Sequence, residues 1–285
     1  MRQVAVIAGF ALRESMRRRV FVVVAVLTTV FLALYGLGTW QAYVAVRDFR
    51  GPGLAGVEPD IVAGATLLGL AMFGTLFLAT VLTVFLTLGV VRGDAERGLL
   101  QPLLVRPVRR PTLLLARFTA AATVSCAYVV AVFVAAAAIT WAIGGWWPDR
   151  IAGPAAQLAL GVAILTALSL AGSVLLASTA NGIAVFMVFG AGLVAGLLGQ
   201  IGEALGSDTL DTVARVASWA LPFEALYQSA LSAITADTVG FTRLALDLGP
   251  FGGAQSAGPA LWAWSVAYLA LVGVAATAGF ARRDL

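Results

Sequence analysis

The chain of 285 residues contains no histidine and no lysine, and its only cysteine is Cys126. The lack of histidine excludes Ser-His and Cys-His nucleophile pairs, the HExxH zinc motif and imidazole metal sites. Without lysine the chain has no P-loop lysine to hold nucleotide phosphates, so it cannot be a P-loop ATPase by itself. A single cysteine excludes an intrachain disulfide, and we expect Cys126 to pack as a small apolar side chain. We therefore predict no enzyme activity and no catalytic, metal or cofactor site in this chain.

Charge is also scarce. Charged residues make up 11% of the chain, hydrophobic residues 61%, and the mean hydropathy is +0.97, whereas soluble domains are about one-quarter charged. Long uncharged runs cover residues 20–46, 61–91, 118–148, 151–202 and 248–281. They are apolar all round, which excludes the alternating strands of a membrane barrel. The composition predicts an all-α polytopic membrane protein.

A transmembrane helix needs about 20 residues, so the run 151–202 is long enough for two. Its sequence Ser178–Gly182, "STANG", is typical of a tight turn and divides it. We treat the first run as a retained span, because its polar leader is long and no small-residue cleavage site follows closely. Six transmembrane helices are predicted within one domain of residues 1–285, at 20–40, 62–91, 116–143, 154–177, 183–203 and 259–281.

The arginines predict the orientation of these helices. If the N-terminus, the segment before the third span and the C-terminus share one side, that side holds thirteen arginines and four carboxylates, a net charge of +9. The other side then holds five arginines and ten carboxylates, a net charge of −5. Basic residues near span ends stay in the cytoplasm. We expect a multi-pass protein of the cell membrane with both termini cytoplasmic, whose pI of about 9.8 reflects topology and not nucleic-acid binding.

The first nineteen residues predict an amphipathic helix on the cytoplasmic face of the bilayer. Apolar residues recur at helical spacing from Val4 to Leu12. The polar residues assigned to this interface helix are Arg13, Glu14, Arg17 and Arg18. Arginines so placed also bind anionic lipid, and a simple positive-inside anchor is an equally compatible interpretation.

Residues 213–235 are apolar but too interrupted to cross the bilayer, because Arg215, Pro222 and Glu224 divide them. We predict an external re-entrant helical hairpin between the fifth and sixth spans, with its bend at Pro222. Glu224 would face an aqueous or protein-lined pocket, and Tyr227 is a further candidate for a transport pathway. The alternative is that Glu224 is simply solvated among the lipid headgroups.

The fifth predicted span contains the G-x-x-x-G pair Gly192 and Gly196. Glycines at this spacing let two helices approach closely. The sequence leaves open whether the partner helix belongs to a second subunit or to the same chain.

The segment 92–111 joins the second and third predicted spans. Asp94 and Glu96 suit the positive N-terminal end of a short helix. Pro107 ends this helix, and Pro102 is atypical inside it. Its apolar side is formed by Leu99, Leu100, Leu103 and Leu104. We predict an amphipathic cytoplasmic helix joined to two transmembrane helices, which suits it to transmit force from a soluble partner.

This segment resembles the loop between the second and third spans of the permease subunits of ABC-2-type ATP-binding-cassette transporters. The family pattern reads roughly R-E-x-G-T-L-E-x-L-L-x-x-P-x-x-R. Leu99 stands where the family often has Thr, and Gln101 where it often has Glu. The sequences 11–21, "ALRESMRRRVF", and 280–285, "FARRDL", are similar to the family's two ends. The residues that match or align in the loop are Glu96, Arg97, Gly98, Leu99, Leu100, Gln101, Leu103, Leu104, Pro107 and Arg110.

The resemblance implies a permease that associates with a second permease, identical or paralogous, and with two copies of a cytoplasmic ABC ATPase. ATP and Mg²⁺ would bind to the ATPase. The loop 92–111 would be the coupling helix, seated in a groove of the ATPase, with the interface helix beside it; its coupling residues would lie from Asp94 to Pro107. Closure of the ATPase dimer would then export or flip an amphiphilic substrate.

Two other functions stay open. An ATPase-independent secondary transporter is disfavoured because no carboxylate lies in the five uncharged runs. A membrane anchor or assembly protein would use the basic loop only to fix its topology. The sequence does not identify the substrate or decide between homodimer and heterodimer.

Overall fold

The computed structural model describes residues 20–48, 57–87, 110–242 and 258–281. The predicted interface helix, at 1–19, and nearly all of the predicted coupling loop, at 92–111, lie outside the described residues. In the described part of the chain every regular element is a helix. The helices are α2 (Val20–Asp48), α3 (Pro59–Thr87), α5 (Arg110–Gly144), α6 (Ala152–Leu175), α7 (Ser178–Leu205), α8 (Asp208–Ala220), α9 (Pro222–Ala233) and α11 (Pro259–Ala281).

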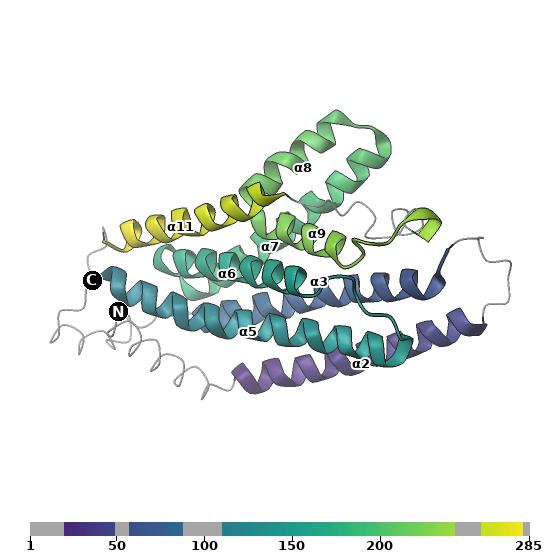
Figure 1. Ribbon diagram of the computed structural model, residues 1–285. Coiled ribbons are helices and arrows are strands. Elements are labelled where there is room, and N and C mark those ends of the chain that lie inside the picture. Colours follow the sequence, from purple (N-terminus) through teal and green to yellow (C-terminus); the bar gives the residue numbers. More distant parts are fainter. Residues whose placement is uncertain (1–19, 49–56, 88–109, 243–257, 282–285) are drawn as a thin grey trace.

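Six of these helices, α2, α3, α5, α6, α7 and α11, are long and apolar enough to cross a membrane. This confirms the predicted membrane-like, all-helical character of the chain. Successive long helices run in opposite directions (Figure 1), so the beginning of α2 and the end of α11 lie at the same end of the bundle. The side of the membrane on which this end lies stays a prediction. We call it the terminal end, and the end that holds the α5–α6 connection the distal end.

The six helices differ in how far protein encloses them. About two thirds of the apolar stretch of α3 is buried, against about one tenth in α2 and in α11. Apolar side chains such as Val26 and Leu34 on α2, Met187 on α7 and Val274 on α11 are exposed. Such surfaces are stable in lipid, where no water penalises them. Thus α3 is central, and α2, α7 and α11 present apolar faces to the surroundings.

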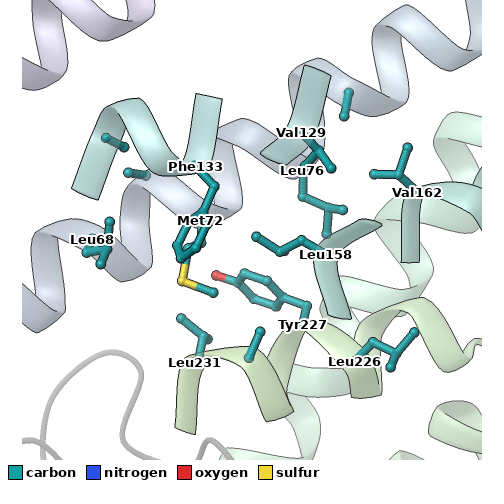
Figure 2. Packing of buried hydrophobic residues seen from close by; sticks show 14 of the residues in the cluster. Leu68, Met72, Leu76, Val129, Phe133, Leu158, Val162, Leu226, Tyr227 and Leu231 are labelled. Atoms are coloured by element: carbon teal, nitrogen blue, oxygen red, sulfur yellow. The ribbon is translucent and has the colours of Figure 1, made fainter. Parts of the chain in front are cut away.

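Most of the core is formed by the long helices α3, α5 and α6 together with the short helix α9 (Figure 2), and α2 and α7 add Tyr35 and Phe189. The ring of Tyr227 on α9 points in among side chains of α3, α5 and α6. α9 is therefore a core element, although it is only 12 residues long. Its fully or nearly fully buried partners include Leu68, Met72 and Leu76 on α3, Val129 and Phe133 on α5, and Leu158 and Val162 on α6.

The connection between α6 and α7 lies slightly before the predicted turn. It falls at Leu176 and Ala177, and α7 already begins at Ser178. Asn181, which we predicted in the turn, is 1% exposed and donates from Nδ2 to the carbonyl of Ser169 at 2.9 Å. The side-chain amide of Asn181 thus joins α7 to α6, and the turn between these helices is formed by Leu176 and Ala177.

Residues 213–235, predicted as a helical hairpin, form most of α8 and all of α9. The two helices meet at Leu221, which has φ −127° and ψ 68° and lies directly before Pro222. They do not pack along each other: α8 packs mainly on the last turns of α7, and α9 packs mainly on α6 (Figure 1). The break at Pro222 therefore sends α9 into the bundle while α8 stays at its periphery.

Candidate functional site

Of the three groups of predicted site residues, the structure describes one. Arg13, Glu14, Arg17 and Arg18 of the interface helix, and the coupling residues Asp94, Glu96, Arg97, Gly98, Leu99, Leu100, Leu103, Leu104 and Pro107, lie outside the described residues. Pro222, Glu224 and Tyr227 all lie in the first two turns of α9. The candidate site is therefore built around α9.

α9 starts at a proline for a physical reason. Pro222 is the first helical residue, where the missing N–H costs nothing because no carbonyl precedes it in the helix. The N–H of Leu221 donates to Ala217 at 2.7 Å and ends α8, and the N–H of Glu224 donates to Leu221 at 3.1 Å. This places the carboxyl group of Glu224 at the third position of a new helix, directed into the bundle.

Glu224 is only 5% exposed. Its Oε1 accepts a hydrogen bond from Nε2 of Gln228, one helical turn later, at 2.8 Å. Burial raises the pKa of Glu224 to about 7, because a carboxylate loses its hydration inside the bundle, and the bond from Gln228 opposes part of this rise. The interpretation of Glu224 as a solvated headgroup residue is therefore wrong for this structure, and the protein-lined position is the one observed.

The first turn of α9 packs on the G-x-x-x-G pair of α7, Gly192 and Gly196. A Cβ at Gly192 would lie 2.5 Å from Cζ of Phe223, and a Cβ at Gly196 would overlap Oε1 of Glu224. Phe223 also stacks on Phe189 of α7, with ring centroids 6.0 Å apart. The pair thus serves packing within the chain, which was one of the two predicted roles.

Tyr227 lies on another side of α9. Its hydroxyl donates to the carbonyl of Gly69 on α3 at 3.3 Å. Gly69 is ten residues after Pro59, so the contact lies about 15 Å along α3 from its start. Burial, and secondarily the charge of Glu224, raise the pKa of Tyr227, so this phenol stays neutral.

A third side of α9 meets an amide on α6. Nε2 of Gln157 donates to Oγ of Ser229 at 2.7 Å, and both side chains are buried. Within the described residues, the buried Oε1 atoms of Gln157 and Gln228 have no hydrogen-bond partner. The described surroundings of α9 therefore include two acceptor oxygens without donors, which does not favour a negative charge on Glu224.

A separate polar network crosses the bundle nearer its terminal end. Oγ1 of Thr83 donates to Oγ of Ser125 at 3.0 Å, and Thr87 shares a hydrogen bond of 2.6 Å with Ser169. Thr83 and Thr166 also lie within 3.3 Å. These hydroxyls join α3, α5 and α6 without any charge, as expected for polar side chains that hold transmembrane helices together.

The chemistry available at α9 is limited to proton exchange. Among the described residues, no three His, Cys, Asp or Glu side chains come together as metal ligands. A carboxyl whose pKa is about 7 can bind or release a proton near neutral pH.

Sequence reasoning identified Pro222, Glu224 and Tyr227 but missed their partners. Gln157 and Gln228 carried a signal, because each is an amide in an apolar stretch that must be buried in any helical bundle. The spacing of Gly192 and Gly196 predicted a close helix contact but not its partner. Gly69, which contributes only its carbonyl, carried no signal at all.

No protein-family model matches the chain, and no curated protein matches it.

Proposed function

We propose that the chain is the transmembrane permease subunit of an ABC-2-type exporter. With a second permease and two ATPase subunits, it would form a pathway that exports or flips an amphiphilic substrate. The observation that carries this proposal is the arrangement of the long helices. α3 ends and α5 begins at the terminal end of the bundle (Figure 1), so their connection, which carries the family-like sequence Glu96–Arg110, starts and finishes at that end.

The residues that the chain lacks support the same proposal. The chain has no lysine and therefore no P-loop lysine, so in this proposal ATP and Mg²⁺ bind to a separate subunit. ATP binds more tightly to the closed ATPase dimer than to the open one. Only such a difference in affinity between two states can shift a conformational equilibrium. In this proposal the coupling residues, from Asp94 to Pro107, transmit the shift to α3 and α5, and the cell membrane is the location.

The test is affinity purification of the tagged full chain from its native membrane. We expect an ATPase with a Walker A lysine to co-purify and to be stimulated by the permease. Glu96→Ala and Arg97→Ala should weaken association or stimulation. Arg150→Ala and Asp237→Ala are matched controls, because both side chains are exposed and lie in connections at the distal end. If the Glu96 and Arg97 variants behave like these controls, the coupling role is wrong.

A proton-driven secondary transporter is the second candidate, and one observation favours it. The sequence argument against it placed every carboxylate outside the spans, but Glu224 is buried inside the bundle. This candidate predicts substrate transport by the purified chain in proteoliposomes under a pH gradient, with no ATPase present. The exporter predicts none under these conditions. A membrane anchor or assembly protein would transport nothing with or without the ATPase.

A further inference from the structure

The carboxyl group of Glu224 is itself part of a helix–helix contact. Its Oε1 occupies the space that a methyl group would need at Gly196, so the side chain packs directly on the backbone of α7. One residue earlier, Phe223 fills the equivalent space at Gly192. The first turn of α9 therefore touches α7 through one apolar and one ionisable side chain.

An ionised carboxylate in this position has little to stabilise it. Nε2 of Gln228 is the donor to Oε1, and a neutral amide does not replace the hydration that burial removes. The position of Glu224 in the first turn of α9 favours its charge through the helix dipole. Burial acts in the opposite direction and raises the pKa of Glu224.

The elements packed against α9 bring few charges to Glu224. α6 has no titratable residue, α11 has only Tyr268, and α7 has only Glu203, seven residues beyond Gly196. α3 carries Asp60 at its start, and α9 itself adds Tyr227. α8 carries Asp208, Asp211 and Arg215. Within the described residues Glu224 forms no ion pair, and the shift of its pKa has no contribution from a basic residue.

Other contacts hold α9 independently of Glu224. Tyr227 and Ser229 bond to α3 and α6. Just beyond α9, the carbonyl of Ile234 accepts from the N–H of Asp149 at 3.1 Å, and the N–H of Asp237 donates to the Asp149 carboxylate at 2.9 Å. The middle and the end of α9 are thus fixed, while its first turn follows the break at Leu221.

We propose that Glu224 is a proton-binding site that controls the contact between α9 and α7. With the proton bound, the neutral carboxyl packs on Gly196 and the first turn of α9 is seated on α7. When the proton leaves as H⁺ to water, the carboxylate must regain hydration, and the first turn of α9 moves away from α7 about the break at Leu221. Proton binding at Glu224 does not depend on whether ATP or a proton gradient drives transport.

The site is tested by labelling the purified full chain with dicyclohexylcarbodiimide, which modifies protonated carboxyl groups, and by locating the label with peptide mass spectrometry. For a pKa of about 7, the labelled fraction of Glu224 should fall about 30-fold between pH 6 and pH 8.5. The exposed Asp237 is the internal control for access of the reagent and for recovery of the peptides. A labelled fraction of Glu224 that is the same at pH 6 and at pH 8.5 would overturn the proton site.

The movement is tested by hydrogen–deuterium exchange of residues 222–233, corrected for the pH dependence of intrinsic exchange. We expect the first turn of α9 to lose protection between pH 6 and pH 8.5 in the natural chain. Glu224→Gln, which keeps the shape of the neutral acid, should stay protected at both values, and Asp237→Asn should behave like the natural chain. Equal protection at both pH values in the natural chain would refute the coupling. Neither measurement needs an ATPase, so their failure is distinct from failure of the exporter proposal.

Discussion

Replacing Gly192 by alanine should destabilise the chain, because the added methyl group would enter the ring of Phe223. The new Cβ would lie 2.5 Å from Cζ and 3.1 Å from Cε2, against a normal carbon–carbon contact of about 3.5–4.0 Å. Phe223 is fully buried and stacked on Phe189, so the ring has no free space to enter. Overpacking of this kind costs about 1–3 kcal/mol.

Gly190→Ala is the matched control, because a Cβ at Gly190, two residues earlier on the same helix, meets nothing within 4 Å. Both variants gain about 1 kcal/mol from the better helix propensity of alanine. The difference between them therefore isolates the collision with Phe223. In a domain of this size it corresponds to an apparent Tm lower by several degrees for Gly192→Ala, measured by thermal unfolding of the purified chain in detergent.

The double variant with Gly192→Ala and Phe223→Leu separates the collision from other effects. Shortening the ring removes the overlapping atoms, so the two substitutions should be less destabilising together than the sum of their separate effects. Equal Tm values for Gly192→Ala and Gly190→Ala would refute the reasoning. So would simple additivity in the double variant, because α9 would then not rest on this glycine.

Three further predictions concern other parts of the bundle. Gly144→Ala should lower the Tm by several degrees, because its Cβ would overlap the ring of Tyr43, and Tyr43→Leu in the same chain should restore part of the loss. The free energy of unfolding should fall as the pH rises from about 4.5 to about 7 and then level off, because Glu224 releases its proton at a lower pH in the unfolded chain than in the folded chain. The upper limit of this loss of stability is roughly 3 kcal/mol. Glu224→Gln should abolish this pH dependence, which is measured as the difference between the free energies of unfolding at pH 5 and pH 8. Thr87→Val and Ser169→Ala should show a coupling of about 0.6 kcal/mol in a double-mutant cycle of unfolding, since their hydroxyls lie 2.6 Å apart.

The long helices could be predicted from the sequence because length and hydropathy alone determine whether a helix fits a bilayer. Even so, α2 extends to Asp48, eight residues past its predicted end. Hydropathy gives no reason for a helix to stop at the membrane surface, and hydrogen bonds continue into water. Asn181 shows the opposite limit: its type suggests a turn, but the carbonyl of Ser169 and a glycine at position 172 give it a place between helices.

The sequence allowed an aqueous or protein-lined pocket for Glu224, or simple solvation, but it could not identify the contacts of this side chain, because they depend on residues far away in the chain. A carboxylate near Pro222 is compatible with each of these positions, and no neighbouring residue decides between them. It becomes a core residue because the break at Leu221 redirects the helix, and because Gly196, 28 residues earlier, leaves room for its oxygen. Each feature is visible in the sequence, but their meeting is a property of the folded chain.

The two polar regions of the bundle differ in what a proton can change. At the terminal end, Thr83 and Thr87 bond to other hydroxyls, which can donate and accept and carry no charge near neutral pH. At α9, Oε1 of Gln157 and Oε1 of Gln228 have no donor within the part of the chain that the structure describes, and the neighbouring Glu224 can be neutral or charged. A protonated Glu224 adds one donor to this set, whereas an ionised Glu224 adds only acceptors. Any response of the bundle to pH should therefore begin at the first turn of α9, while the hydroxyl network keeps α3, α5 and α6 together.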